Sequence, residues 1–210
     1  ILVELKKMDV GSSSKEIYTY LLKKLVRDKT SLIPSRIERR MQGVKWSKSF
    51  NNLHKLRFSP KEKEFAFMLI QDLIPVNARL HRKNSDHRCL RNDFGGNQCL
   101  EIQDRMHFFI NCRVIHETAA FLKHLLLVFL GKQFNRSEIL HLSFSVVNKK
   151  TTAPMAWVTV KCFFKMFHAK EIDRKVIFRE IIWDMDLYKD IGIFKVDEFK
   201  DLRAFIIENV

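Results

Sequence analysis

The sequence has little glycine and little proline: 6 Gly and 4 Pro among 210 residues. This scarcity argues against a turn-rich β-sandwich, because each hairpin of such a fold needs turn residues. Leu, Ile, Phe and Lys are abundant, and 46% of the residues are apolar, which is enough to build a core. We therefore expect an ordered, all-α protein with helices joined by short loops.

Long hydrophobic runs are also missing, since none reaches the roughly 18 to 20 residues that span a bilayer. The longest candidate, AAFLKHLLLVFLG at 119–131, is interrupted by Lys123 and His124 and predicts a buried core helix. The first residues, ILVELKKMDV, show no signal-peptide pattern, and a chain that does not begin with Met is typical of a fragment or trimmed protein. We expect an intracellular protein, nuclear or cytoplasmic, without a membrane partner.

Catalytic constellations cannot be found in the sequence either. No Asp-Asp pair occurs, and spacing indicates neither a nucleophile with its base nor a pair of catalytic carboxylates. Asp184 and Asp186 in IIWDMDLY predict a solvated helix face rather than a metal site. The sequence therefore predicts that the protein is not an enzyme.

Positive charge is plentiful and concentrated in the first half of the chain. Residues 1–91 carry 21 Lys/Arg against 9 Asp/Glu, whereas residues 92–210 carry 17 against 15. A clustered excess of this size suits a polyanion and makes RNA or DNA the leading partner class. The alternative is a solvated face that only keeps the protein soluble.

Helix signals recur along the chain. In SPKEKEFAFMLIQDLIP, Ser59 is an N-cap, Pro60 occupies the first helical position and Glu62 completes a capping box, so an apolar core helix should follow. The other expected helices are 12–29, 34–44, 46–57, 76–83, 113–130, 137–147, 151–170, 171–188 and 196–210. A strand stays open for AWVTVKCFF at 156–164 because of its β-branched residues.

These elements predict an irregular multi-helix bundle with a small embedded zinc-knuckle-like loop. We divide it into basic helices at 1–75, the knuckle-like segment at 76–115 and a helical bundle at 116–210, together forming one compact unit. The only Gly-Gly pair, at 95–96, marks irregular backbone inside the middle segment.

Three of the four cysteines lie in the middle segment beside a histidine. Zinc takes four Cys or His ligands in a tetrahedron, usually as two short-spaced pairs. His107 and Cys112 form one such pair, whereas Cys89 and Cys99 are unusually far apart. Each doubling of a loop costs only about 0.6 kcal/mol, while zinc is worth on the order of 10 kcal/mol in small fingers. Cys89, Cys99, His107 and Cys112 therefore predict a structural zinc site.

Two alternatives stay open for this cluster. The cysteines and His107 are equally explained as ordinary buried residues that bind no metal. His87 and His116 are rival fourth ligands.

Three stretches together resemble the C-terminal zinc-binding region of non-LTR (LINE-type) retrotransposon reverse transcriptases. They are KWSKSFNNLHKLRFSPKEKEFAFMLIQDLIP, then LIPVNARLHR with Val76 where Thr is frequent, and finally IQDRMHFFINC. In that family a Cys-x-x-Cys pair precedes a His and a last Cys. Cys99, His107 and Cys112 match that spacing, whereas seven extra residues separate Cys89 from Cys99. The resemblance covers residues 10–130.

The resemblance implies the zinc-binding, nucleic-acid-gripping end of such a polymerase, or a domesticated derivative without the catalytic core. Basic side chains at the entrance to the site would contact RNA or DNA phosphates. His81, Phe94 or Phe108 would offer an unpaired base a stacking surface, although Phe108 and Phe109 are better explained as core residues. The predicted nucleic-acid-binding residues are Arg79, His81, Arg82, Lys83, Arg88 and Arg91.

The competing hypothesis is a helical protein-interaction module derived from a retroelement. Its near-neutral C-terminal half would bind a protein partner or form a homodimer, and its basic half would only aid solubility. Such a dimer would use the final helix or the group Leu125, Leu126, Leu127 and Phe129.

Overall fold

The computed structural model describes residues 49, 58–76, 88–92, 98–144, 149–169, 172–191 and 199–210. All of them belong to the unit Val44–Val210. The fold of this part of the chain is all-α, as predicted, and its only β-type pairing is two isolated bridges. The helices predicted at 12–29, 34–44 and 76–83, and nearly all of the one at 46–57, lie outside the described residues. The division into three segments stays a prediction.

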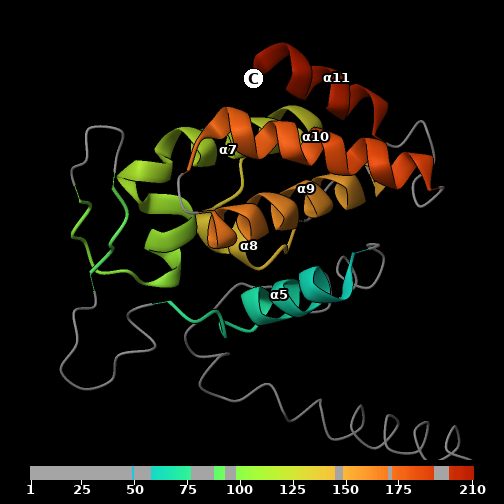
Figure 1. Cartoon of the computed structure of the whole chain (residues 1–210). Coiled ribbons are helices and arrows are strands. Elements are labelled where there is room, and N and C mark those ends of the chain that lie inside the picture. Colours follow the sequence, from blue (N-terminus) through green and yellow to red (C-terminus); the bar gives the residue numbers. More distant parts are fainter. Residues whose placement is uncertain are drawn as a thin grey trace, which may run out of the picture. The chain divides into compact units, whose positions relative to one another are not determined.

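Helix α9 (Lys149–His168) is the centre of the bundle (Figure 1). It packs against α5 (Pro60–Ile70), α7 (His116–Leu130) and α10 (Arg174–Asp190), and α10 packs in turn against α11 (Lys200–Asn209). The remaining described helical elements are α8 (Arg136–Leu140), the π-helix η1 (His107–Asn111) and the 3-10 turn η2 (Arg113–Ile115).

Helix α5 begins as its sequence predicts. The Ser59 hydroxyl accepts a bond from the Glu62 amide at 3.4 Å, and the Glu62 carboxylate accepts one from the Ser59 amide at 2.9 Å, which completes the capping box. The helix buries Phe65 and Leu69 but leaves Phe67 exposed. The helix lies in the core, as predicted, but only one of its faces is buried.

The stretch AWVTVKCFF is helical, so the strand alternative is wrong. Every residue from Met155 to Phe163 is buried, because α9 has neighbours on several sides. Burial of this extent outweighs the modest intrinsic preference of Val and Thr for extended backbone.

Helix α7 is the core helix that its apolar run predicts. Gly131 ends it in the left-handed conformation, at a φ of 67°, and donates its amide to the Leu127 carbonyl. Leu125 and Leu126 are fully buried, so neither is available to the predicted dimer contact. No helix in the described ranges is both long enough and apolar enough to cross a membrane.

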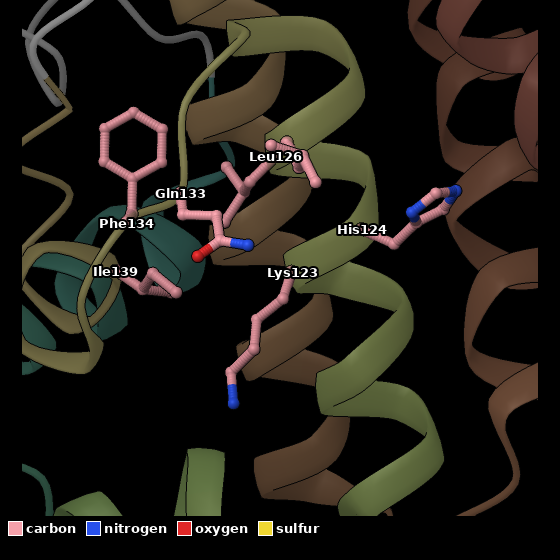
Figure 2. Close-up of a pocket in the computed structure, with 7 residues that line it drawn as sticks. Lys123, His124, Leu126, Gln133, Phe134 and Ile139 are labelled. Atoms are coloured by element: carbon pink, nitrogen blue, oxygen red, sulfur yellow. The ribbon is translucent and has the colours of Figure 1, made fainter.

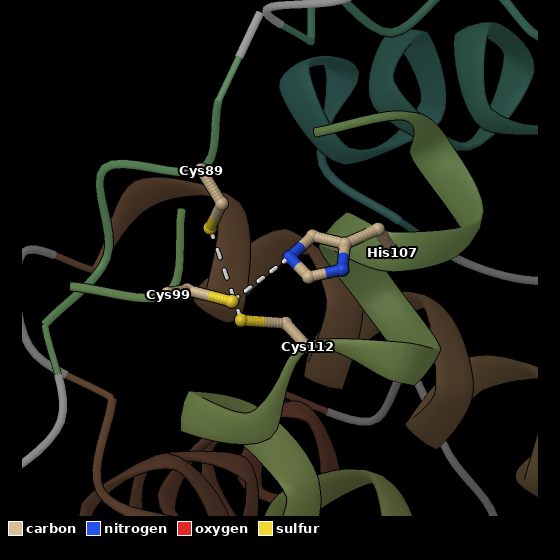
Figure 3. Close-up of side chains that lie close together, drawn as sticks. All are labelled: Cys89, Cys99, His107 and Cys112. Atoms are coloured by element: carbon tan, nitrogen blue, oxygen red, sulfur yellow. Dashed lines mark hydrogen bonds between the residues drawn. The ribbon is translucent and has the colours of Figure 1, made fainter. Parts of the chain in front are cut away.

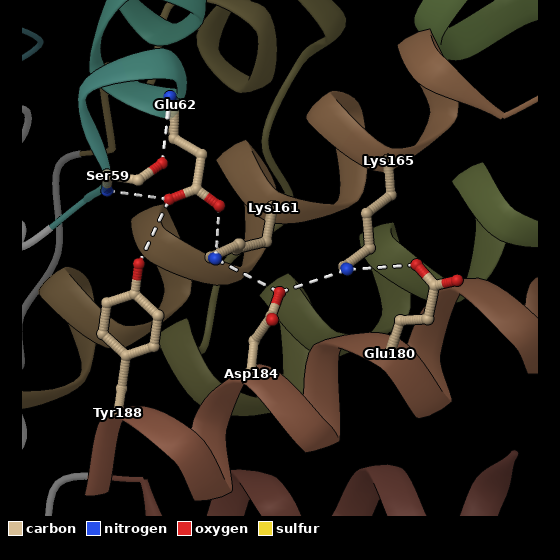
Figure 4. Close-up of polar contacts among 7 residues, drawn as sticks. All are labelled: Ser59, Glu62, Lys161, Lys165, Glu180, Asp184 and Tyr188. Atoms are coloured by element: carbon tan, nitrogen blue, oxygen red, sulfur yellow. Dashed lines mark hydrogen bonds and ion pairs between the residues drawn. The ribbon is translucent and has the colours of Figure 1, made fainter. Parts of the chain in front are cut away.

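A buried lysine joins three helices in a network of ion pairs (Figure 4). Lys161 of α9 contacts the carboxylates of Glu62 on α5 and Asp184 on α10, the latter at 3.1 Å. Lys165, one helical turn further on, contacts Asp184 at 3.1 Å and Glu180 at 3.0 Å. Asp184 is thus committed to ion pairs within the bundle, rather than lying on a merely solvated face.

The other oxygen of Glu62 is also engaged. It accepts a bond from the Tyr188 hydroxyl at 3.3 Å in addition to the Ser59 amide. Burial and the neighbouring Glu62 raise the pKa of Tyr188 to about 12, so the hydroxyl stays protonated and donates. The N-terminus of α5 is therefore held to α9 and α10 by one carboxylate.

His141 is buried as a neutral side chain after α8. Its Nδ1 donates to the Ser137 carbonyl at 2.7 Å, and its Nε2 accepts from Arg105 at 3.0 Å. Burial, followed by the charge of Arg105, lowers the pKa of His141 from 6.5 to about 4. Protonation therefore opposes folding at this position.

We expect His141 to make the fold sensitive to acid. Between pH 6.5 and about pH 4, unfolding takes up a proton at His141. The free energy of unfolding should therefore decrease as the pH is lowered through this window, by about 3 kcal/mol in total. His141→Gln keeps an acceptor for Arg105 and a donor for Ser137 but cannot titrate. Urea unfolding at several pH values should show a flatter slope for the variant, and equal slopes for both proteins would contradict the assignment.

Candidate metal centre

Cys89 and Cys99 lie on two stretches that run side by side in opposite directions. The Cys89 amide donates to the Glu101 carbonyl at 2.7 Å, and the Cys99 amide donates to the Arg91 carbonyl at 3.0 Å. The bridged pairs are Arg88 with Ile102 and Asn92 with Gln98. The stretch between Asn92 and Gln98 therefore begins and ends at paired positions. Its length does not increase the distance between the two thiols.

Alternation along the two stretches turns both thiols inward. Successive side chains of extended backbone point to opposite faces, and Cys89 and Cys99 are buried while Leu90 and Leu100 are exposed. Leu100 has a φ of 56°, which bends the chain directly after Cys99. The first two ligands thus share one face of a short hairpin-like pairing.

The other two ligands come from a π-helical turn. Asp104 accepts a bond from the His107 amide at 2.6 Å, and the Cys112 amide donates to the His107 carbonyl at 2.9 Å, five residues back. A five-residue step turns about 140° in an α-helix, but the wider π turn brings His107 and Cys112 to the same side. Figure 3 shows both side chains directed at the two cysteines.

The four side chains form one buried cluster whose ligand atoms all lie within 4.8 Å of one another. The Cys89 and Cys112 sulfurs are 3.8 Å apart, and the Cys99 sulfur is 3.4 Å from Nε2 of His107 (Figure 3). Tetrahedral zinc with ordinary bond lengths sets two sulfurs about 3.8 Å apart, and a sulfur and a nitrogen about 3.6 Å apart. The cluster can hold a metal ion, and its donor set is compatible with zinc.

The electrostatics of the two closest thiols suit a metal. The hydrogen bond from the Cys112 thiol lowers the pKa of Cys89 to about 4, against the effect of burial, and the Arg91 amide helps. The same contact and burial raise the pKa of Cys112. These opposite shifts favour one negative charge on the pair, which a bound cation would stabilise.

Three polar residues between Cys99 and His107 orient the ligands. Nδ1 of His107 lies 2.9 Å from the Glu101 carboxylate, which leaves Nε2 turned toward the sulfurs. Gln103 donates to the Cys89 sulfur at 3.6 Å, and Asp104 caps the turn that carries His107. The sequence analysis missed these residues, and the polar run EIQD between two predicted ligands was the signal that could have found them.

Arg91 faces the interior rather than the solvent. Its guanidinium lies 3.6 Å from the centre of the Phe108 ring and donates to the carbonyls of Phe108, at 2.5 Å, and Met166, at 3.2 Å. Burial lowers the pKa of Arg91, and the nearby Cys112 and Cys89 oppose that effect. Arg91 therefore ties the segment that carries the cluster to α9, and its role in binding phosphates stays a prediction.

The other predicted site residues have different outcomes. Arg88 is exposed on the outer face of the pairing, beside the cluster. His116 is exposed on α7 and is not part of the cluster, which removes one rival ligand. Phe109 is fully buried and Phe108 packs against it at 4.8 Å, as the core explanation predicts. The remaining predictions fall outside the described residues: Arg79, His81, Arg82, Lys83, His87 and Phe94.

A pocket of about 280 Å³ lies between α7 and the chain that leads into α8 (Figure 2). Its wall is mainly apolar, with Leu126, Phe134 and Ile139, and Gln133 and Lys123 supply its polar atoms. His124 turns toward α11 and packs near Phe205 instead of pointing into the pocket. The pocket thus has no set of convergent polar groups, and the cysteine–histidine cluster stays the candidate site.

Comparisons with known proteins identify no relative of this chain. The resemblance to reverse-transcriptase zinc-binding regions therefore stays a prediction from the sequence, and evidence on function comes from the residues of this chain. No protein family, no curated protein and no solved structure matches the chain.

Proposed function

We propose that Cys89, Cys99, His107 and Cys112 hold a structural zinc ion, and that the chain is a non-enzymatic module that binds nucleic acid beside it. The observation that carries the zinc proposal is the spacing of the ligand atoms, 3.8 Å between the Cys89 and Cys112 sulfurs and 3.4 Å between the Cys99 sulfur and Nε2 of His107. These separations are those of a tetrahedral zinc site. All four ligand atoms also lie within 4.8 Å of one another, as one shared ion requires.

A structural role fits this site better than a catalytic one. Catalytic zinc keeps one position open for water or substrate, whereas here four protein ligands are available and all four are buried. With three thiolates the zinc site would carry one net negative charge, which the neighbouring Arg91 balances. The ion would fasten the paired stretches around Cys89 and Cys99 to the helical turn at 107–112.

The nucleic-acid proposal depends on the distribution of charge. Residues 1–91, which lead into the site, carry 21 Lys/Arg against 9 Asp/Glu. Arg79, Arg82 and Lys83 lie just before the first ligand, and Arg88 is exposed next to it. A metal site directly preceded in the sequence by basic residues is suited to phosphate contacts.

Reversing the charge at Arg79, Arg82 and Lys83 tests this function. We expect the triple Glu variant to bind a labelled RNA hairpin, or DNA of the same sequence, at least about tenfold more weakly than the unaltered chain. The slope of log affinity against log salt concentration should flatten by up to about three, since the loss of each phosphate contact reduces the slope by about 0.9. Fluorescence anisotropy over a series of salt concentrations measures both quantities.

The matched control changes the same amount of charge elsewhere. Lys123, Arg136 and Lys200 are exposed basic residues of the second half, and their triple Glu variant has the same net charge as the first. It should keep most of the salt slope. Equal loss in both variants, or an unchanged slope in the first, would contradict binding at the entrance to the zinc site.

A further inference from the structure

The side of α10 that faces away from the core carries a row of exposed apolar side chains. Trp183 is 72% exposed, and the others are between 47% and 59% exposed. Positions seven and four residues apart lie along one side of a helix, opposite the buried Ile181 and Met185. We call this row the α10 stripe, and it consists of Val176, Trp183, Leu187 and Ile191.

The α10 stripe is more than scattered surface hydrophobicity. Single exposed apolar residues are normal on any protein, but several on one side of a helix around a largely exposed tryptophan are typical of interfaces. Burial of a tryptophan side chain also contributes a large favourable free energy, because it removes a large apolar area from water. The arrangement therefore indicates a partner that covers this side of α10.

Basic and acidic side chains beside the stripe lie at opposite ends of α10, so they are complementary to those of a second, antiparallel copy. Lys175 and Arg179 lie in the first half of α10, and Asp186 and Asp190 lie in the second half, all on the same side of the stripe. Asp186 binds Arg203 of α11 at 2.7 Å and 2.8 Å, which marks this side as the one next to α11. This side of α10 thus carries two basic residues near its start and Asp190 near its end, since Asp186 is already paired with Arg203.

A two-fold axis through Trp183 brings opposite charges together. Such an axis pairs the two copies of α10 in opposite directions and keeps the same side of each helix together. Asp190 of one copy then lies opposite the interval between Lys175 and Arg179 of the other. A parallel pairing would instead place this charged side of one copy beside the opposite flank of the other, so that these opposite charges would not meet.

We propose that the α10 stripe is a homodimer interface, in which a second copy of this chain packs antiparallel against α10 with Trp183 at the two-fold axis. A single pair of helices buries less than the roughly 1,600 Å² of a standard interface. We therefore expect a dissociation constant of about 10 µM. This interface does not depend on zinc or on nucleic acid.

Sedimentation of the full chain from about 1 to 100 µM tests the dimer. The unaltered chain should change from monomer to dimer over this range, and Trp183→Glu, a change at an exposed position, should stay monomeric with unaltered helix content. Val128→Glu is the control, because Val128 is also exposed and apolar but lies on α7. A chain that stays monomeric throughout, or a dimer unaffected by Trp183→Glu, would overturn the proposal.

Charge exchange tests the antiparallel geometry itself. Arg179→Glu alone and Asp190→Lys alone should each weaken the dimer about tenfold or more, because each sets like charges opposite one another. The double variant should regain the affinity, since the carboxylate introduced at position 179 of one copy would meet the ammonium group introduced at position 190 of the other. A double variant weaker than either single variant would rule out this pairing.

Discussion

Removing the metal is expected to unfold the segment from Cys89 to Cys112 while most of the helical core persists. Structural zinc is worth on the order of 10 kcal/mol in small domains, comparable with the whole free energy of unfolding of an ordinary domain. The paired stretches have few buried apolar residues of their own, whereas α7, α9 and α10 share a large core. Loss of the metal should therefore unfold this segment before it unfolds the helical core.

Metal analysis and hydrogen exchange measure this effect. The purified chain should contain one zinc per molecule, and a chelator should remove it. Amides at 88–92 and 98–112 should then lose protection, and those in α9 should keep most of theirs. A metal-free chain with full protection at 98–112 would show that the thiols are ordinary buried residues.

Variants of single cysteines supply the control. Cys112→Ala should abolish stoichiometric zinc and reproduce the effect of the chelator. Cys162→Ala also removes a fully buried thiol, but Cys162 lies in α9 outside the cluster. It should keep its zinc and cost only about 1 kcal/mol for the small cavity that it leaves. Equal zinc content in the two variants would exclude Cys112 as a ligand.

Replacing Lys161 with Met should destabilise the fold by about 3 kcal/mol. Loss of one partner from a buried ion pair is costly because the remaining charge stays buried and unpaired. The Glu62 side chain is only 8% exposed, and Asp184 is 22% exposed. Glu62 keeps its bonds to Ser59 and Tyr188, which holds the cost at the low end of the range for such pairs.

Lys165→Met is the matched control for this prediction. Lys165 occupies the next turn of α9 and also pairs with Asp184, but its other partner, Glu180, is half exposed. Its loss should cost only about 1 kcal/mol, because water can solvate the half-exposed Glu180 and Asp184 keeps its pair with Lys161. The double variant Lys161→Met, Glu62→Gln should recover part of the stability. Urea unfolding measures all three, and equal costs for the two single variants would contradict a buried network.

Local signals in the sequence predicted much of the fold. The capping box at Ser59 and Glu62 and the apolar run of α7 involve residues that are close together in the sequence. Such interactions depend on little beyond the neighbouring residues, which is why a pattern can predict them. The error at AWVTVKCFF has the opposite cause, because burial against several helices decided the conformation of α9.

The candidate site was only partly predictable. The pattern predicted the four side chains that form the cluster, but it left rival ligands open and could not show that backbone pairing closes the wide interval from Cys89 to Cys99. Arg91 shows the same limit: its sequence position suggested phosphate binding, whereas its side chain is held by Phe108 and Met166. Met166 lies 75 residues further along the chain, and no local pattern reports a contact of that range.

The sequence by itself determined the all-α class, the start of α5, the end of α7 and the identity of the four side chains that can hold a metal. These features depend on residue type and short spacing. Only the tertiary structure decided that the four ligand atoms meet, that Lys161 lies between two carboxylates and that the α10 stripe is left exposed. Each of these is a relation between surfaces far apart in the chain, and it exists only once the helices have packed.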